Sequence, residues 1–227
     1  MKETGILFTP ENHRLILSGA KRQTRRVVRF PQPRDKKYGL VNWQSTVMGS
    51  RLHVTSTDGI VFDTASGPSK GMQDHVLSCP QGGVGDRLYV KEGVIVHASI
   101  PQLVGYYMDG CRVTEHWEKR LTAMFMPRWA ARTWLEITDV RVQKLDEISE
   151  EDSIAEGIIE ENVIVGANCN GGIHREETAI RYFPPSGDED GYLSAVEAYE
   201  HLWDSINRKK HPWRENPWAF AITFKRL

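Results

Sequence analysis

The sequence predicts an α+β domain built on a small mixed or antiparallel β-barrel, with helices packed around it. Short segments with alternating apolar residues outnumber the helical ones, and they run in the order helix, several strands, two helices and a strand. Long crossover connections, which a parallel sheet needs, are few. The 227 residues are 40% hydrophobic, enough for a single domain over residues 1–227 to bury a core.

The N-terminal region predicts a helix followed by a turn. Thr9-Pro10-Glu11 is typical of a helix start, because Thr caps the backbone, Pro fits the first helical position and Glu complements the helix dipole. Gly19 is expected to end the helix. Residues 21–24 then lie on the turn, and an extended segment begins at Val27.

Four later segments read as strands. Residues 87–92 alternate apolar and charged side chains, as a half-buried strand does. Residues 103–108 form a second strand, ended by a hairpin-type turn at Asp109-Gly110. Residues 134–142 form a long strand with a bulge near Asp139. The last strand has one apolar face, made by Phe220, Ile222 and Phe224.

Two further helices are expected in the second half of the chain. Ser149 begins a short helix with an acidic first turn, which ends at Gly157 or soon after. Residues 194–206 form the clearest helix, and its apolar stripe is expected to close the barrel core together with the last strand. The stripe consists of Val196, Tyr199, Leu202, Trp203 and Ile206. We expect an inserted hairpin or long loop over residues about 31–80. A second, loop-like insertion is expected over residues about 160–192.

Composition limits the function classes. The net charge of −1 excludes a uniformly basic surface, and the absence of about 18 consecutive apolar residues predicts no membrane span. Three scattered cysteines without CxxC spacing, Cys79, Cys111 and Cys169, favour a reducing cytoplasm. Cys169 with His174 supplies too few ligands for zinc, so neither a metal nor another cofactor is expected.

The strongest candidate for chemistry is Lys21 with Thr24, three residues apart. A Thr hydroxyl is a poor nucleophile until a base takes its proton. Lys21 can be that base if burial or the nearby cations Arg22, Arg25 and Arg26 lower its pKa. The alternative is a solvated basic turn from which Thr24 starts a strand.

Three other features admit both a functional and a structural interpretation. Glu156 precedes Gly157 on an otherwise apolar stretch and either faces a pocket or lies exposed. The basic run 21–37, which contains Arg29, either follows a phosphate backbone or is a solvated face. Trp129, beside Arg128, either stacks on bases or packs.

Three patches of the chain resemble the ASCH family, whose fold is a PUA-like β-barrel. Residues 17–26 resemble the family's G-x-K-T-x-T-x-R opening, and residues 85–92 resemble its GD-x-L-x-V strand. The third patch is Leu135 to Val140, running on to residues 148–157. The longer form, with residues 126–130 and 202–207, resembles ASCH proteins of bacteriophages and prophages.

The resemblance implies two kinds of function. Small bacterial members resemble amidohydrolases that remove the acyl group from N4-acetylcytidine, with roles that fall on Lys21, Thr24 and Glu156. Other members are linked to RNA binding or RNA cleavage. Arg22 stands where the family has Thr, which is expected to narrow or recharge the pocket, and the two insertions are expected to cover or extend it.

The resulting hypothesis is a cytoplasmic amidohydrolase, without cofactor, that acts on N4-acylated cytidine in a nucleoside or nucleic acid. The alternative is an RNA-binding module or ribonuclease of phage origin. Partners are a modified nucleoside or RNA and not a membrane. Catalysis is assigned to Lys21, Thr24 and Glu156, and substrate or nucleic-acid binding to Arg22, Arg25, Arg26, Arg29 and Trp129.

Overall fold

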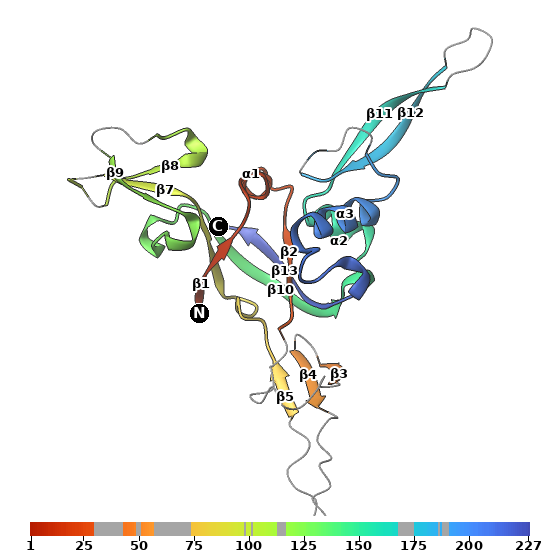
Figure 1. Ribbon diagram of the computed structural model, residues 1–227, viewed down its shortest axis with the longest axis horizontal. Helices are drawn as coiled ribbons and strands as arrows, with labels where there is room; N and C mark the ends of the chain where they lie inside the picture. Colours follow the sequence, from red (N-terminus) through yellow and green to blue (C-terminus); the bar gives the residue numbers. More distant parts are fainter. Residues whose placement is uncertain are drawn as a thin grey trace, which may run out of the picture.

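The computed structural model shows a mixed α+β protein with few helices and several sheets (Figure 1). The structure describes residues 1–29, 43–48, 51–56, 74–97, 99–100, 102–112, 117–167, 175–185, 187 and 191–227. None of the sheets formed by these residues closes into a barrel. The predicted α+β class is therefore confirmed, whereas the predicted barrel closure is absent from this part of the chain.

The central sheet has five strands in the order β1-β6-β10-β13-β2. Its β1–β6 pair is parallel and its other pairs are antiparallel. The bounds are β1 Glu3–Leu7, β6 Arg87–Lys91, β10 Trp134–Lys144, β13 Trp218–Arg226 and β2 Gln23–Val27. Strands β1 and β2 are the two edges, and a side chain bridges them, because the Arg26 guanidinium donates to the Leu7 carbonyl at 2.8 Å.

Helix α1, Pro10–Ser18, connects the two edge strands and begins and ends as predicted. The Thr9 hydroxyl accepts from the backbone N–H of Asn12, and Gly19 ends the helix with a left-handed φ of 82°. Strand β2 differs from the expectation, because it begins at Gln23, four residues before Val27. Thr24 is consequently a strand residue, paired with Ile222 of β13, and does not lie on a turn.

The core of the central sheet follows the predicted strands. Strand β6 alternates half-buried and buried residues, and the pairing of β10 with β13 shifts register between Ile137 and Asp139, where the bulge was expected. Phe220, Ile222 and Phe224 are buried against residues of β6 and β10, among them Leu88 and Ile137.

A second core lies between the two later helices, and this corrects the expectation of a single core. Helix α2 is Glu150–Ala155 and helix α3 is Ala195–Asn207, capped by the Ser149 and Ser194 hydroxyls. Tyr199, Leu202 and Trp203 of α3 pack with Leu145, Ile148 and Ile158. Ile206 was expected in the same stripe but is 59% exposed, because it lies in the last turn of α3, where it lines a pocket.

Three smaller antiparallel sheets surround the central one. Within the first insertion, β3 Trp43–Met48, β4 Arg51–Ser56 and β5 Asp74–Leu77 form a three-stranded sheet. A second sheet has the order β8-β7-β9, with β7 Val94–His97, β8 Val104–Tyr106 and β9 Trp117–Leu121. The predicted strand 103–108 is therefore shorter, and a 3₁₀ turn over Tyr107–Asp109 precedes Gly110. The other 3₁₀ turns are Ala123–Phe125, Arg128–Ala130, Leu145–Glu147 and Trp213–Glu215.

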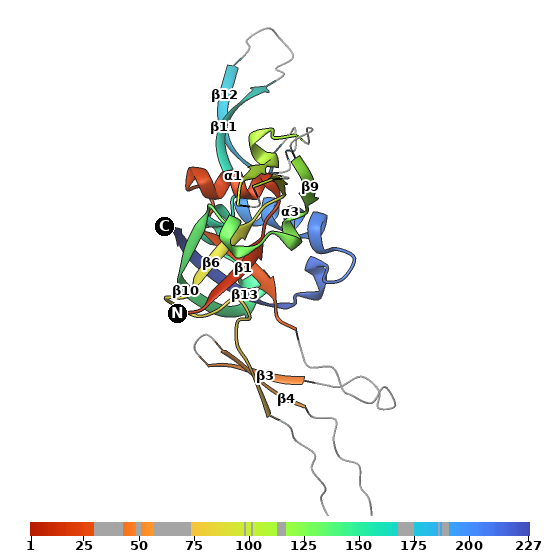
Figure 2. The ribbon, with the colours of Figure 1, turned by 90° about the vertical axis from the view of Figure 1, so that its left-hand side faces the viewer.

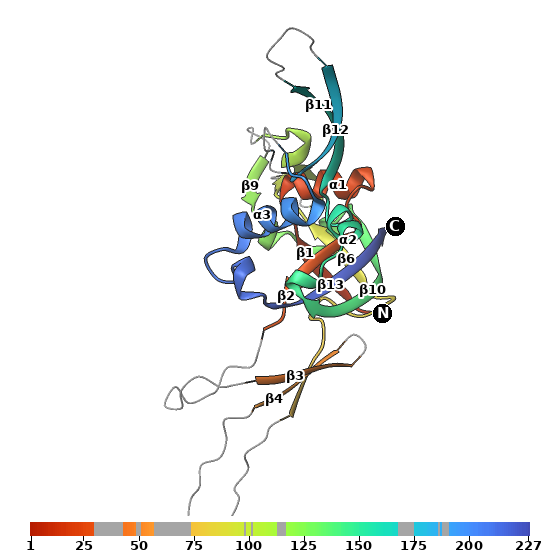
Figure 3. The same cartoon turned by 90° about the vertical axis from the view of Figure 1, so that its right-hand side faces the viewer.

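The loop expected over residues 160–192 is instead mostly a long hairpin of β11 Ile159–Ala167 and β12 Arg175–Phe183. Ile164 and Ile180 are both exposed, so apolar side chains of this hairpin face solvent, and its sequence lacks the alternation by which strands are recognised. Figures 2 and 3 show the hairpin above the central sheet and the β3–β5 sheet below it. Within the described part of the chain, no helix is both long and apolar enough to span a lipid bilayer.

Truncation of Trp203 tests the second core. Trp203 is 4% exposed, and its indole N–H donates to the His211 carbonyl at 2.8 Å. We expect Trp203→Ala to lower the free energy of unfolding by about 3–5 kcal/mol, as large core truncations do. Trp129→Ala is the control, since Trp129 is 55% exposed and its loss should change stability by less than about 0.5 kcal/mol. Equal urea midpoints for the two variants would contradict the packing described.

Candidate active site

A pocket of about 370 Å³ opens between the two edge strands of the central sheet and helix α3. Leu7 and Phe8 line it from the end of β1, and Thr9 and Asn12 from the start of α1. Thr24 to Val27 line it from β2. Helix α3 contributes Tyr199, Leu202, Trp203, Ile206 and Asn207. Lys21 and Glu156 complete the lining, so the three predicted catalytic residues share one pocket with Arg25 and Arg26.

Lys21 and Glu156 form a buried ion pair at the pocket. The Lys21 Nζ donates to Glu156 Oε2 at 3.0 Å and also to the backbone carbonyl of Glu156. Both side chains are buried. Of the two interpretations left open for Glu156, the pocket-facing one therefore holds, and Lys21 is not part of a solvated turn.

Backbone contacts fix both residues of this pair. The Lys21 N–H donates to the Leu15 carbonyl, and the Arg22 N–H donates to the Ala155 carbonyl of α2. Gly157 follows Glu156 with φ of 104°, and a Cβ there would lie 2.9 Å from the Leu15 side chain and 3.6 Å from Lys21 Cβ. Glycine is thus required twice, for the backbone conformation and for the close approach of α1.

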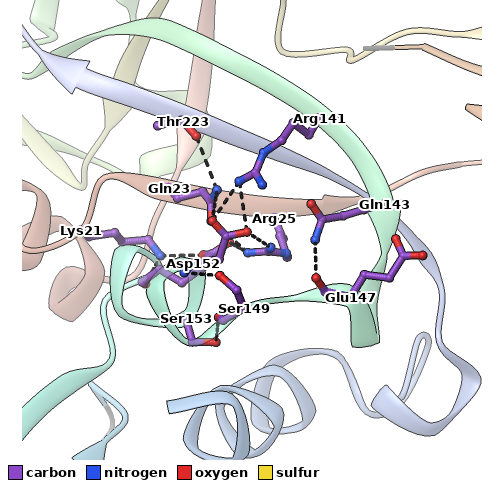
Figure 4. Close-up of polar contacts among 11 residues, drawn as sticks. Lys21, Gln23, Arg25, Arg141, Gln143, Glu147, Ser149, Asp152, Ser153 and Thr223 are labelled. Atoms are coloured by element: carbon purple, nitrogen blue, oxygen red, sulfur yellow. Dashed lines mark hydrogen bonds and ion pairs between the residues drawn. The ribbon is translucent and has the colours of Figure 1, made fainter. Parts of the chain in front are cut away.

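Arg25 organises a buried polar network beneath the pocket, part of which Figure 4 shows. Its guanidinium donates to Glu156 Oε1 at 3.2 Å, to Asp152 Oδ2 at 2.9 Å and to Gln23 Oε1 at 3.0 Å. Arg141 of β10 donates to both oxygens of Asp152. Because Asp152 and Glu156 are four residues apart, α2 presents both carboxylates on one side, where Arg25 bridges them.

The pocket lowers the pKa of Lys21, so the neutral amine is easier to form there than in water. Burial lowers the pKa of Lys21 below its ordinary 10.5, Glu156 opposes this shift, and Arg26 and Arg25 add to it. At Asp152, burial raises the pKa, but the bonds and charges of Arg141 and Arg25 outweigh it, so the net pKa is lowered and the carboxylate stays ionised. Lys21 therefore has the environment of a general base.

Two polar groups in the lining are left without partners. The Thr24 hydroxyl makes no hydrogen bond with any described residue, although Thr24 is buried and lines the pocket. Asn12 donates its amide N–H to Thr9, which leaves Asn12 Oδ1 buried and unpaired. A buried acceptor without a donor costs free energy, so an N–H of a bound molecule would be favoured there.

The remaining predicted binding residues are dispersed. Arg22 is exposed and does not line the pocket, so the expected narrowing or recharging at this position is not observed. Arg29 lines a neighbouring groove and not the pocket. Trp129 lies in the 3₁₀ turn Arg128–Ala130, and this turn lines neither the pocket nor the groove. Arg34, Lys36, Lys37, Cys169 and His174 lie outside the described residues. Among described residues, the pocket lining includes none from either insertion.

Sequence reasoning missed the residues that hold the catalytic candidates in place. Gln23, Asp152 and Arg141 lie on three elements that only the fold brings together. Only Asp152 carried a signal, its spacing of four residues from Glu156. No sequence pattern pointed to Asn12, because its interest lies in the unpaired Oδ1 atom, which only the structure reveals.

No group of three or more His, Cys, Asp or Glu side chains within the described ranges is arranged to hold a metal ion. Comparisons with protein-family models, with curated proteins and with solved structures find no match. The function is therefore inferred from the geometry of the pocket.

Removal of Arg25 tests the network. Arg25→Ala leaves Glu156 paired only with Lys21 and Asp152 paired only with the half-exposed Arg141, and breaking a buried ion pair costs about 3–5 kcal/mol. Arg141→Ala is the matched control, because the Arg141 side chain is 44% exposed and such surface pairs contribute about 0–1 kcal/mol. Urea unfolding measures both, and equal losses would show that Arg25 is no more important than a surface cation.

Proposed function

We propose that the protein is an amidohydrolase that removes the acyl group from N4-acylated cytidine-type substrates. The observation that carries this is the buried Lys21, which bonds Glu156 and shares a pocket with the unpartnered hydroxyl of Thr24. A base of lowered pKa and a free hydroxyl in the same pocket are the two groups that an activated nucleophile needs. The resemblance of the Lys21–Thr24 segment to amidohydrolases of the ASCH family supports the same reaction.

Each residue then has one role in the reaction. Neutral Lys21 takes the proton of the Thr24 hydroxyl as its oxygen bonds to the acyl carbon. The protonated Lys21 gives that proton to the exocyclic nitrogen, and the C–N bond breaks. The amine leaves, and the acyl group stays on Thr24 as an ester. A water then attacks the ester carbon while Lys21 takes one of its protons. Lys21 passes that proton to the Thr24 oxygen as the ester C–O bond breaks, so the carboxylic acid is released and the Thr24 hydroxyl is restored. Glu156 accepts from Lys21 and orients it.

The oxyanion and the amide each have a candidate partner in the lining. The Arg26 guanidinium is fixed by the Leu7 carbonyl and lies over the Phe8 ring at 5.4 Å, and its other N–H groups are suited to the oxyanion. The unpaired Asn12 Oδ1 is suited to accept an N–H of the substrate. The proposed chemistry uses no cofactor.

The finer fold assignment and the location belong to the same proposal. A mixed five-stranded sheet with a long bulged strand supports a PUA-like fold, opened at the pocket between β1 and β2. Cys79 and Cys111 are free thiols, which supports a reducing cytoplasm.

Substitution of the three catalytic candidates tests the reaction. We expect Lys21→Ala, Thr24→Ala and Glu156→Gln each to lower acetate release from N4-acetylcytidine by about 10²-fold or more. Losses in the double variants should be smaller than the product of the single losses, since the groups act as a unit. Thr138→Ala is the matched control, an exposed Thr of β10 outside the pocket.

Absence of acetate release by the unaltered protein would overturn the proposal. Binding of RNA without hydrolysis would then favour the binding-module alternative.

The pH dependence tests the state of Lys21. Activity should rise with pH as Lys21 loses its proton, with a midpoint below the ordinary 10.5 because burial lowers this pKa. Glu156 raises the pKa of Lys21, so the residual activity of Glu156→Gln should reach its midpoint at a lower pH than that of the unaltered protein. Initial rates between pH 5 and 10 measure both midpoints. A shift to higher pH in Glu156→Gln would contradict the assignment of Lys21 as the base.

A further inference from the structure

A second groove, of about 630 Å³, adjoins the candidate active site. Arg26, Val27, Ile206 and Asn207 line both cavities, so the two share a wall formed by β2 and the end of α3. The rest of the groove is formed by Arg29, Pro80 and Gln81 and by residues 209–211. In Figure 3, α3 and the chain that follows it lie on one side of β2.

The lining of this groove is cationic. Arg26, Arg29, Lys209 and Lys210 contribute positive charge, His211 lies beside them, and the described residues of the lining include neither Asp nor Glu. Arg29, Lys209 and Lys210 are exposed, and within the described residues none of the three has a carboxylate partner. We call this cavity the basic groove.

The cations of the basic groove are gathered at one cavity and come from two separate parts of the chain. Several exposed cations elsewhere have carboxylate partners, as in the pairs Arg128–Glu3, Arg141–Asp152 and Lys225–Glu136, whereas Arg29, Lys209 and Lys210 have none among the described residues. Lys209 and Lys210 follow the C-terminus of α3, where its dipole attracts cations. That dipole does not account for Arg29, which lies beyond the end of β2, so the gathering of cations from two elements needs another cause.

We propose that the basic groove binds the phosphate of a nucleotide whose acylated base occupies the adjoining pocket. This inference rests on the proposed function and specifies its substrate as a nucleoside monophosphate. A pocket of about 370 Å³ accommodates a base, and the groove of about 630 Å³ adjoins it at Arg26, Val27, Ile206 and Asn207, so the ribose would extend past these residues toward the groove. Arg and Lys are the side chains that bind phosphate, through charge-assisted hydrogen bonds.

The experiment compares two substrates and two triple variants. Acetate release is measured from N4-acetylcytidine and from its 5′-monophosphate, and the ratio of the two kcat/KM values is the readout. One variant carries Arg29→Ala, Lys209→Ala and Lys210→Ala. Arg26 is left intact because it also lines the pocket. The control variant removes three exposed cations elsewhere, by Arg112→Ala, Lys119→Ala and Lys225→Ala.

The unaltered protein should prefer the monophosphate by at least about tenfold, the effect of one charge-assisted hydrogen bond. The groove variant should bring the ratio close to one, and the control variant should keep it. A ratio near one in the unaltered protein would overturn the proposal, as would equal effects of the two triple variants. A preference only for an oligonucleotide that contains N4-acetylcytidine would also overturn it, in favour of a backbone phosphate.

A direct binding measurement separates this proposal from the proposed function. Calorimetry compares cytidine 5′-monophosphate with cytidine, and needs no hydrolysis. Tighter binding of the monophosphate, lost in the groove variant and weakened by salt, supports the basic groove even if no acetate is released. Acetate release together with equal binding of the two ligands would support the hydrolase and overturn the groove.

Discussion

The site depends on one buried cation shared between two carboxylates. The Arg25 guanidinium joins Asp152 and Glu156 of the α2 segment to strand β2, at distances of 2.9 and 3.2 Å. Burial makes each carboxylate costly alone, and the shared cation offsets this cost. Because Glu156 also bonds Lys21, the same cation determines where the lysine amine lies.

The open side of the central sheet is what provides room for a substrate. Paired β1 and β2 strands would bring their backbones to the usual spacing of about 4.8 Å and fill the space with ladder hydrogen bonds. A single Arg26–Leu7 hydrogen bond links them instead, and α1 connects their ends. The pocket lies at this opening, with α3 on its other side. The opening between the two edge strands and the candidate site are thus the same feature of the fold.

The sequence predicted what local rules determine. Helix α1 began and ended at Thr9 and Gly19 because caps act over a few residues, and the bulge of β10 lay near Asp139 as expected. The β11–β12 hairpin was missed because its apolar residues, such as the exposed Ile164 and Ile180, do not alternate with polar ones in the pattern of a half-buried strand. The pocket-facing position of Glu156 remained open until the fold was known, because its partners Lys21 and Arg25 are more than 130 residues away.

The position of β13 has a consequence for biosynthesis. Strand β2, which carries Thr24 and Arg25, is an edge strand whose neighbour among the described strands is β13, residues 218–226. On a ribosome, α1 and β2 therefore leave the exit tunnel long before their sheet partner is translated. Until then Arg25 and its neighbours lack the sheet that positions them, so this region folds only after β13 is available. The order in which the ribosome delivers the chain thus makes the pocket one of the last parts of the fold to form.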